Sequence, residues 1–197
     1  MGKMEKYLLK KGYETINEDY PSTQFSIEKI AEVVMQDIIV KRCNDSQAVI
    51  HFVTHSLGGI IVRYLLTKNK IYNLGRVVML APPNDGSEVA DWLENNYLYK
   101  RFLGPAGQEL GTGNESIPKR LGPVKFQVGI IAGNRSINPI NSLVINKPND
   151  GKVAVERTKV EGMLDFLVVS RPHPLIMNCK EVMFQTEHFL RKGYFLR

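Results

Sequence analysis

The sequence predicts an α/β fold in which a mostly parallel sheet is covered by helices on both faces. The strand-like runs are continuously apolar rather than alternating, which is typical of strands buried on both faces. Segments with helical spacing of apolar residues separate these runs. The 197 residues are 43% hydrophobic and 23% charged, enough for one core, so we expect a single domain over residues 1–197.

The individual elements follow from local patterns. Met4, Tyr7 and Leu8 recur at helical spacing and predict a first helix. A second helix is predicted from Ser26 to Ile38, because apolar residues recur at helical spacing and Ser26 is a favourable N-cap. Strands are predicted at residues 13–17, 48–53, 76–81, 125–133 and 165–169. Further helices are predicted at residues 59–68, 87–96 and 179–193.

Residues 97–125 break the alternation. This segment is rich in glycine and proline, and its apolar residues are dispersed. A loop of this length is usually functional or mobile. It is therefore interpreted either as a lid or pocket wall over the site, or as a surface excursion.

Charge and cysteine content exclude several classes of protein. The 26 basic and 20 acidic residues give a net charge of +6, but the basic residues are scattered and form no stripe interleaved with aromatics. We therefore expect no nucleic-acid partner. The net charge is the only feature of the sequence that favours attraction to a membrane surface. Cys43 and Cys179 are far apart and in no CxxC spacing, which predicts neither a disulfide framework nor a metal site. Without a spanning apolar run or a leader in the sequence given, a cytoplasmic location is expected.

The stretch VIHFVTHSLGG, residues 49–59, predicts a nucleophile. An apolar strand run ends at Thr54, and a helical run follows Gly58, with Ser56 at the turn between them. A serine on a sharp strand-to-helix turn is exposed for attack, as in the GxSxG elbow. Thr54 replaces the first glycine of that pattern, so the alternative of a simple helix N-cap has to be weighed. The flanking strand and the small Gly58-Gly59 pair favour the nucleophile.

Four histidines compete to be the base that activates Ser56. His55 is its sequence neighbour, whose side chain points elsewhere, and His51 lies within a buried strand. His188 is the second choice, inside the last helix. His173 is preferred because it follows a strand in a loop, where an open α/β sheet presents its functional residues.

The acid that orients the base is predicted to be Asp150. It lies in a turn before Gly151, whereas the runner-up, Asp165, opens a strand. The order Ser56, Asp150, His173 is that of the serine, acid and histidine in α/β-hydrolases. The backbone N–H of Leu57 is expected to donate one hydrogen bond to the oxyanion.

Several longer blocks resemble those of small bacterial esterases and lipases with the α/β-hydrolase fold. They are VTHSLGG at 53–59, LAPPNDGSEVADWL at 80–93, GPAGQELGT at 104–112, GIIAGN at 129–134, NDGKVAVERT at 149–158 and FLRKGYF at 189–195. The resemblance covers nearly the whole chain. It implies the same roles for Ser56, Asp150 and His173.

One family feature is absent from the sequence. The resemblance implies an apolar strand ending in His-Gly that precedes the first helix in sequence and lies in the sheet between the strands predicted at 13–17 and 48–53. None of the four histidines precedes glycine, so the sequence given does not contain this strand. We therefore expect an N-terminally truncated version of the fold, with an in-frame apolar segment ending in His-Gly encoded upstream of Met1.

These features predict a serine carboxylesterase or lipase that forms an acyl-enzyme on Ser56 and needs no metal or cofactor. Apolar residues in 97–125 favour a small-molecule or lipid ester with a lipid-like or medium-length acyl chain. The alternative is a catalytically impaired binding protein with the same fold, or an inactive truncated product, because one oxyanion donor is missing.

Overall fold

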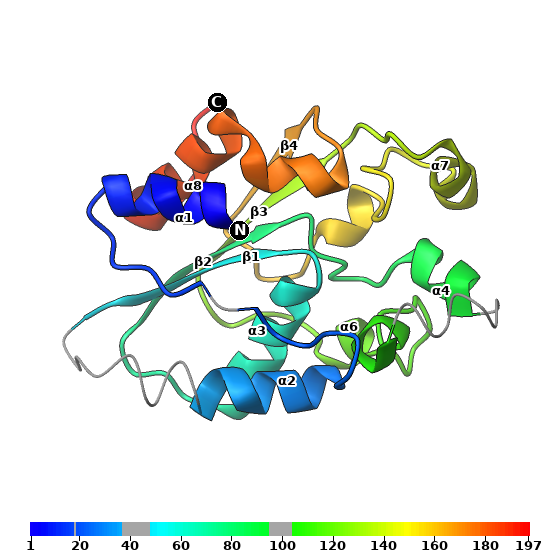
Figure 1. The fold of residues 1–197 in the computed structure, drawn as a ribbon, viewed down its shortest axis with the longest axis horizontal. Coiled ribbons are helices and arrows are strands. Elements are labelled where there is room, and N and C mark those ends of the chain that lie inside the picture. Colours follow the sequence, from blue (N-terminus) through cyan, green and yellow to red (C-terminus); the bar gives the residue numbers. More distant parts are fainter. Residues whose placement is uncertain (18, 37–47, 95–103) are drawn as a thin grey trace.

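A computed structural model describes residues 1–17, 19–36, 48–94 and 104–197. Its sheet has four strands in the spatial order β1 (Ile50–His55), β2 (Leu74–Leu80), β3 (Val128–Gly133) and β4 (Asp165–Val169). Every neighbouring pair is parallel. The sheet lies between two layers of helices (Figure 1), which confirms the predicted α/β class.

Successive residues of β2 face opposite helical layers. Val78 and Leu80 pack in a cluster with residues of α1 (Gly2–Lys10) and α8 (Lys180–Lys192). Val77 and Met79 belong to a cluster with Val62 of α3 (Leu57–Lys68). All four β2 side chains are fully buried, which explains why this strand reads as a continuous apolar run.

A second helix packs on the outside of α3. Ile27 and Ile30 of α2 (Ile27–Val33) are fully buried against Ile60, Ile61 and Leu65. Ser26 caps α2 as predicted, since its hydroxyl accepts from the Lys29 N–H at 3.3 Å. The last part of this predicted helix, residues 37–38, lies outside the described residues.

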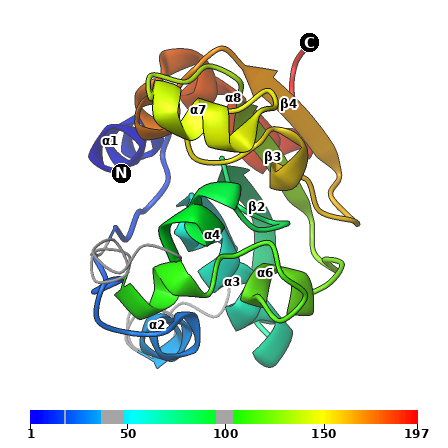
Figure 2. The ribbon, with the colours of Figure 1, turned by 90° about the vertical axis from the view of Figure 1, so that its right-hand side faces the viewer.

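Short elements fill the connections around the sheet (Figure 2). They are α4 (Glu88–Glu94), α6 (Ile117–Arg120), α7 (Pro139–Ile145) and the 3₁₀ helices η2 (Glu156–Thr158) and η3 (His173–Asn178). The α4 helix lies within the predicted 87–96, of which residues 95–96 are not described.

The strand predicted at residues 13–17 was wrong, since this segment has no regular structure. The Tyr13 N–H donates to the Leu8 carbonyl at 3.2 Å, which turns the chain back under α1. The Tyr13 ring meets the His51 ring of β1 edge-on, with centroids 6.1 Å apart. The side chain of Tyr13, rather than its backbone, therefore faces β1.

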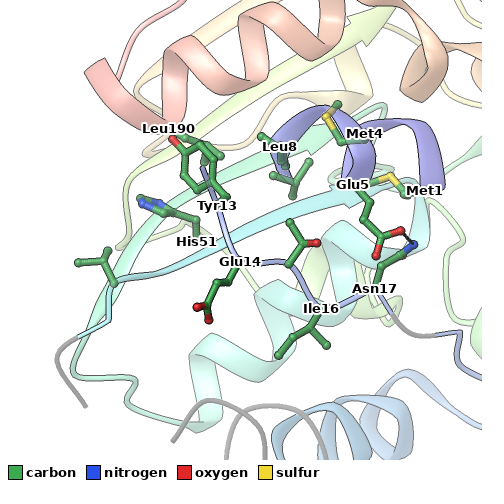
Figure 3. A pocket seen from close by; sticks show the side chains of 13 residues that line it. Met1, Met4, Glu5, Leu8, Tyr13, Glu14, Ile16, Asn17, His51 and Leu190 are labelled. Atoms are coloured by element: carbon green, nitrogen blue, oxygen red, sulfur yellow. Dashed lines mark hydrogen bonds between the residues drawn. The ribbon is translucent and has the colours of Figure 1, made fainter. Parts of the chain in front are cut away.

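A cavity of about 160 Å³ lies between α1, residues 13–17 and the face of β1 that carries His51 and Val53 (Figure 3). Its lining is mixed, with apolar residues such as Met4 and Leu8 beside polar ones such as Glu5 and Asn17. None of Ser56, Asp150 and His173 lines it, so it is separate from the predicted catalytic site.

The described part of the 97–125 segment packs against the α2 and α3 layer. Ala106 is fully buried in the cluster of these helices, and the Glu109 carboxylate accepts from the Ile27 N–H at 2.8 Å. Residues 97–103 lie outside the described residues. The described part is thus fixed to the domain core, and its role as a lid or pocket wall stays a prediction.

Gly129 in β3 is expected to be sensitive to substitution. A Cβ there would lie 2.5 Å from Cε2 of Phe189, a residue of α8 whose ring is fully buried. We expect Gly129→Ala to lower the free energy of unfolding by about 1–3 kcal/mol, because the packed ring has no room to move. Urea unfolding measures this effect. Gly113→Ala is the matched control, since a Cβ at Gly113 meets nothing within 4 Å, and equal stability of the two variants would contradict the prediction.

Candidate active site

Ser56 lies between the last residue of β1 and the first of α3. Its φ of 53° and ψ of −124° are a conformation that non-glycine residues rarely adopt. The Ser56 N–H donates to the Leu80 carbonyl at 2.9 Å, which ties the turn to β2. This is the strained strand-to-helix turn predicted for residues 54–58.

Close packing explains the small residues after the serine. A Cβ at Gly59 would lie 3.0 Å from Pro82 and 3.3 Å from Met79. A Cβ at Gly58 would lie 3.3 Å from the Tyr20 hydroxyl and 3.4 Å from Thr54. Larger residues would push α3 away from the sheet and displace Ser56.

Asp150 and His173 reach Ser56 from the loops after β3 and β4. His173 Nε2 lies 2.9 Å from Ser56 Oγ, and His173 Nδ1 lies 2.7 Å from Asp150 Oδ2. Asp150 is 1% exposed and His173 3%. The structure therefore brings the three predicted side chains into one hydrogen-bonded chain. Pro172 and Pro174 flank His173 in the sequence and do not keep it from reaching the serine.

The Asp150 carboxylate is itself held in place. Its Oδ1 accepts from the N–H groups of Lys152 and Val153, both at 2.9 Å, which leaves Oδ2 for His173. A carboxylate can only accept, so His173 Nδ1 carries the proton and Nε2 is free to accept from the Ser56 hydroxyl. This is the arrangement required of a general base.

The runner-up residues lie elsewhere. His188 sits in α8 between the rings of Phe184 and Tyr194. The Asp165 carboxylate, at the start of β4, accepts from the Phe195 N–H at 2.7 Å and pairs with Arg197, so it anchors the C-terminal tail. His51 Nδ1 accepts from the Arg76 N–H at 2.8 Å.

Leu57 is the first residue of α3, so its N–H has no acceptor within the helix. It follows Ser56 directly at the positive end of the helix dipole. The role of this N–H as an oxyanion donor stays a prediction.

The structural role of Arg63 was not predicted from the sequence. This side chain of α3 is 2% exposed, and its guanidinium donates to the carbonyls of Asn84, Pro118 and Gly122 at 2.8, 3.3 and 2.7 Å. Burial lowers the pKa of Arg63 to about 10. The signal that could have indicated this role is a basic residue within the apolar helical run of residues 59–68. Arg63 fastens α6 and the loop after β2 to the helix that carries Ser56.

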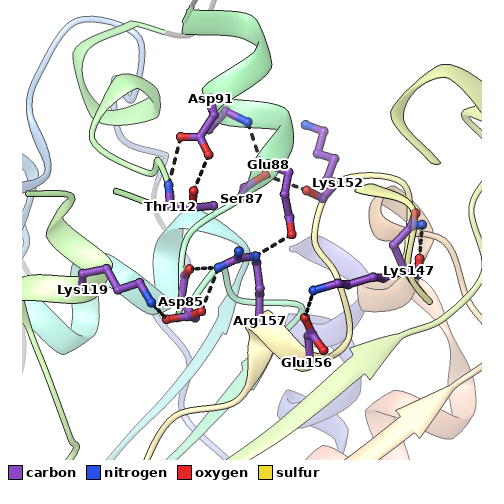
Figure 4. Close-up of polar contacts among 12 residues, drawn as sticks. Asp85, Ser87, Glu88, Asp91, Thr112, Lys119, Lys147, Lys152, Glu156 and Arg157 are labelled. Atoms are coloured by element: carbon purple, nitrogen blue, oxygen red, sulfur yellow. Dashed lines mark hydrogen bonds and ion pairs between the residues drawn. The ribbon is translucent and has the colours of Figure 1, made fainter. Parts of the chain in front are cut away.

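An ion-pair network connects residues 85–88, which follow β2, to residues 152–157, which follow Asp150 (Figure 4). Arg157 in η2 contacts Glu88 through Nε at 2.5 Å and Asp85 through an Nη at 2.8 Å. Ser87 adds a hydrogen bond from its hydroxyl to the Lys152 carbonyl at 2.8 Å. The network therefore supports the backbone on which Asp150 lies.

We expect Arg157→Met to lower the free energy of unfolding by about 1–2 kcal/mol, since it leaves the partly buried Glu88 carboxylate without its cation, while Asp85 keeps its ion pair with Lys119. Thermal unfolding measures the change. Lys147→Met removes a more exposed pair with Glu156 and is the matched control, with little expected effect. A melting temperature equally shifted in both variants would contradict a special role for Arg157.

Two further properties concern metals and membranes. Over residues 1–17, 19–36, 48–94 and 104–197, no group of three or more His, Cys, Asp and Glu side chains is placed to hold a metal ion. In the same ranges, no helix has both the length and the apolar character needed to cross a membrane.

Part of the chain matches a known protein family. Residues 13–85 match the family described as "Putative serine esterase (DUF676)". A search of the curated proteins found no significant match.

Among solved structures, the mature lipase BlEst2 of Bacillus licheniformis is similar with a TM-score of 0.71 and 19% identity, over 96% of this chain and 83% of the lipase. The phospholipase PlaB of Legionella pneumophila gives 0.64 and 20% identity, over 80% of this chain and 42% of the phospholipase. The metagenomic carboxyl esterase MGS0156 gives 0.60 and 20% identity, over 78% of this chain and 52% of the esterase. This chain thus spans less than half of the phospholipase and about half of the esterase.

The match over residues 13–85 supports a hydrolase of ester substrates, and the shared sheet and helical layers agree with the lipases and esterases above. The chain therefore adopts the α/β-hydrolase fold.

Proposed function

We propose that the protein is a serine hydrolase that cleaves carboxylic esters through an acyl-enzyme on Ser56. The observation that carries the proposal is the hydrogen-bonded chain from Ser56 Oγ through His173 to Asp150, at 2.9 and 2.7 Å. A serine hydroxyl is a weak nucleophile until a neighbouring base takes its proton. Here His173 Nε2 lies within hydrogen-bond reach of that proton.

The acylation step follows from this geometry. Ser56 Oγ attacks the ester carbonyl carbon while its proton passes to His173 Nε2, and Asp150 stabilises the resulting imidazolium. The Leu57 N–H donates to the oxyanion of the tetrahedral intermediate. The C–O bond to the alcohol then breaks, and His173 returns the proton to the departing alkoxide.

Deacylation repeats the sequence with water. His173 Nε2 takes a proton from a water molecule, whose oxygen attacks the acyl carbonyl carbon. The intermediate collapses to a carboxylic acid, and the proton on His173 restores the Ser56 hydroxyl. All atoms come from the ester, water and these side chains, so the step needs no metal or cofactor.

We assign lipid-like or medium-chain esters as the substrate class. Support comes from the apolar residues of the 97–125 segment and from the names of two proteins of similar structure, a lipase and a phospholipase. Ala106 and the apolar side chains of Leu110, Ile117 and Leu121 pack with α2 and α3, and α3 directly follows Ser56. An acyl chain attached to Ser56 could extend along this wall.

Hydrolysis of p-nitrophenyl acetate, octanoate and palmitate tests the proposal, with the Ser56→Ala chain as the blank. We expect kcat/KM to be highest for octanoate. Equal rates for acetate and octanoate would overturn the acyl-chain assignment. No hydrolysis of any ester by folded protein would overturn the proposed function and favour a binding protein with this fold.

A further inference from the structure

The residue before the nucleophile makes a contact that the catalytic triad does not account for. His55 Nε2 lies 3.0 Å from the backbone carbonyl oxygen of His173. A carbonyl oxygen can only accept, so His55 Nε2 carries the proton and donates it. The two rings lie with their centroids 4.7 Å apart and their planes tilted by 47°. The end of β1 is thus linked directly to the start of η3.

The bond from His55 adds to two other hydrogen bonds that hold His173 in place. Its N–H donates to the Asp150 carbonyl at 2.9 Å, and its Nδ1 donates to the Asp150 carboxylate at 2.7 Å. Both of these contacts tie His173 to the acid loop. The bond from His55 is the contact that ties its backbone to the strand carrying Ser56. Without it, the distance between His173 Nε2 and Ser56 Oγ depends on the relative position of two loops.

His55 is suited to this role because it stays neutral. Burial and repulsion from the charge that forms on His173 lower the pKa of His55 to about 4. A neutral ring donates the Nε2 hydrogen bond without placing a second positive charge beside the imidazolium formed during acylation. The same donation prevents Nε2 from acting as a base, which separates the roles of the two histidines.

We propose that His55 is a positioning residue that holds the base His173 at hydrogen-bond distance from Ser56 through the His173 carbonyl. This inference rests on the proposed function. It assigns His55 no contact with the substrate. Removing the bond should therefore lower kcat and leave KM nearly unchanged, since a misplacement of about 1 Å can cost on the order of 100-fold in rate.

Four substitutions, three at His55 and one control at His51, test the inference on p-nitrophenyl octanoate. His55→Phe keeps a planar ring but cannot donate, and we expect kcat to fall by about 10- to 100-fold. His55→Gln places an amide N–H close to the former Nε2, and we expect kcat close to that of the parent. His51→Gln, on the same strand but away from His173, is the matched control and should leave kcat unchanged. His55→Asn, whose amide is too short to reach the carbonyl, should behave like His55→Phe and replaces it if that variant does not fold.

The pattern across the variants decides the outcome. Rescue by Gln together with a kcat defect in Phe or Asn supports the inference. Parental kcat in Phe or Asn would overturn it, and so would equal losses in Gln and Phe, which would indicate packing alone. These results leave the proposed function standing as long as the parent hydrolyses the ester and reacts with a fluorophosphonate. If the parent does neither, the proposed function and the role of His55 fail together.

Discussion

Replacing Ser56 with alanine is expected to lower kcat for p-nitrophenyl octanoate by about 10⁶-fold, to the background rate of the assay. In the proposed mechanism, the Ser56 hydroxyl is the only one of the three groups that forms a bond to the acyl carbon. Its removal leaves His173 and Asp150 in place but without a nucleophile to deprotonate. Steady-state hydrolysis at saturating ester measures the loss.

The Ser56→Ala chain should remain folded. The alanine keeps the Cβ and the backbone bond to the Leu80 carbonyl, so the turn between β1 and α3 can form. The exposed Ser170, which directly follows β4, provides the control, and Ser170→Ala should retain parental kcat. Residual turnover within tenfold of the parent would show that another group performs the chemistry.

Replacing Asp150 with asparagine is expected to lower kcat by about 10⁴-fold. The amide oxygen can still accept from the N–H groups of Lys152 and Val153, which directs the amide N–H₂ at His173 Nδ1. Nδ1 must then accept, so the ring proton moves to Nε2. Nε2 can no longer accept the proton of Ser56, although the side chains have hardly moved.

Asp165→Asn is the control that separates the two carboxylates considered for the acid. Asp165 bonds the C-terminal tail, so its substitution can affect stability but should leave kcat unchanged. A large kcat loss in Asp165→Asn with near-parental activity in Asp150→Asn would reverse the assignment.

The sequence predicted the parallel core well because burial on both faces leaves a continuous apolar signal. In β2, Val77 and Val78 are each fully buried, against opposite helical layers, so nearly every residue of the run is apolar. The Ser56 turn was predictable for a related reason. Close approach of Pro82 to position 59, and of Tyr20 and Thr54 to position 58, favours glycine at both positions, which is visible in the sequence.

Other features had no local signal. Residues 13–17 have strand-like composition, but a strand forms only where a partner backbone is available, and here the side chain of Tyr13 faces His51. The bond from His55 to His173 joins positions 118 residues apart. Alternation of side chains along β1 correctly separated His55 from Ser56, yet it could not indicate which distant carbonyl His55 would meet.

The central claim is that Ser56 is an activated nucleophile, and reaction with a fluorophosphonate tests it without knowledge of the natural ester. Intact mass of the parent, the Ser56→Ala chain and the Ser170→Ala chain would be recorded after incubation with the probe. The account predicts one adduct on the parent and on Ser170→Ala, and none on Ser56→Ala. A folded parent that gains no adduct, or an adduct that persists in Ser56→Ala, would contradict it.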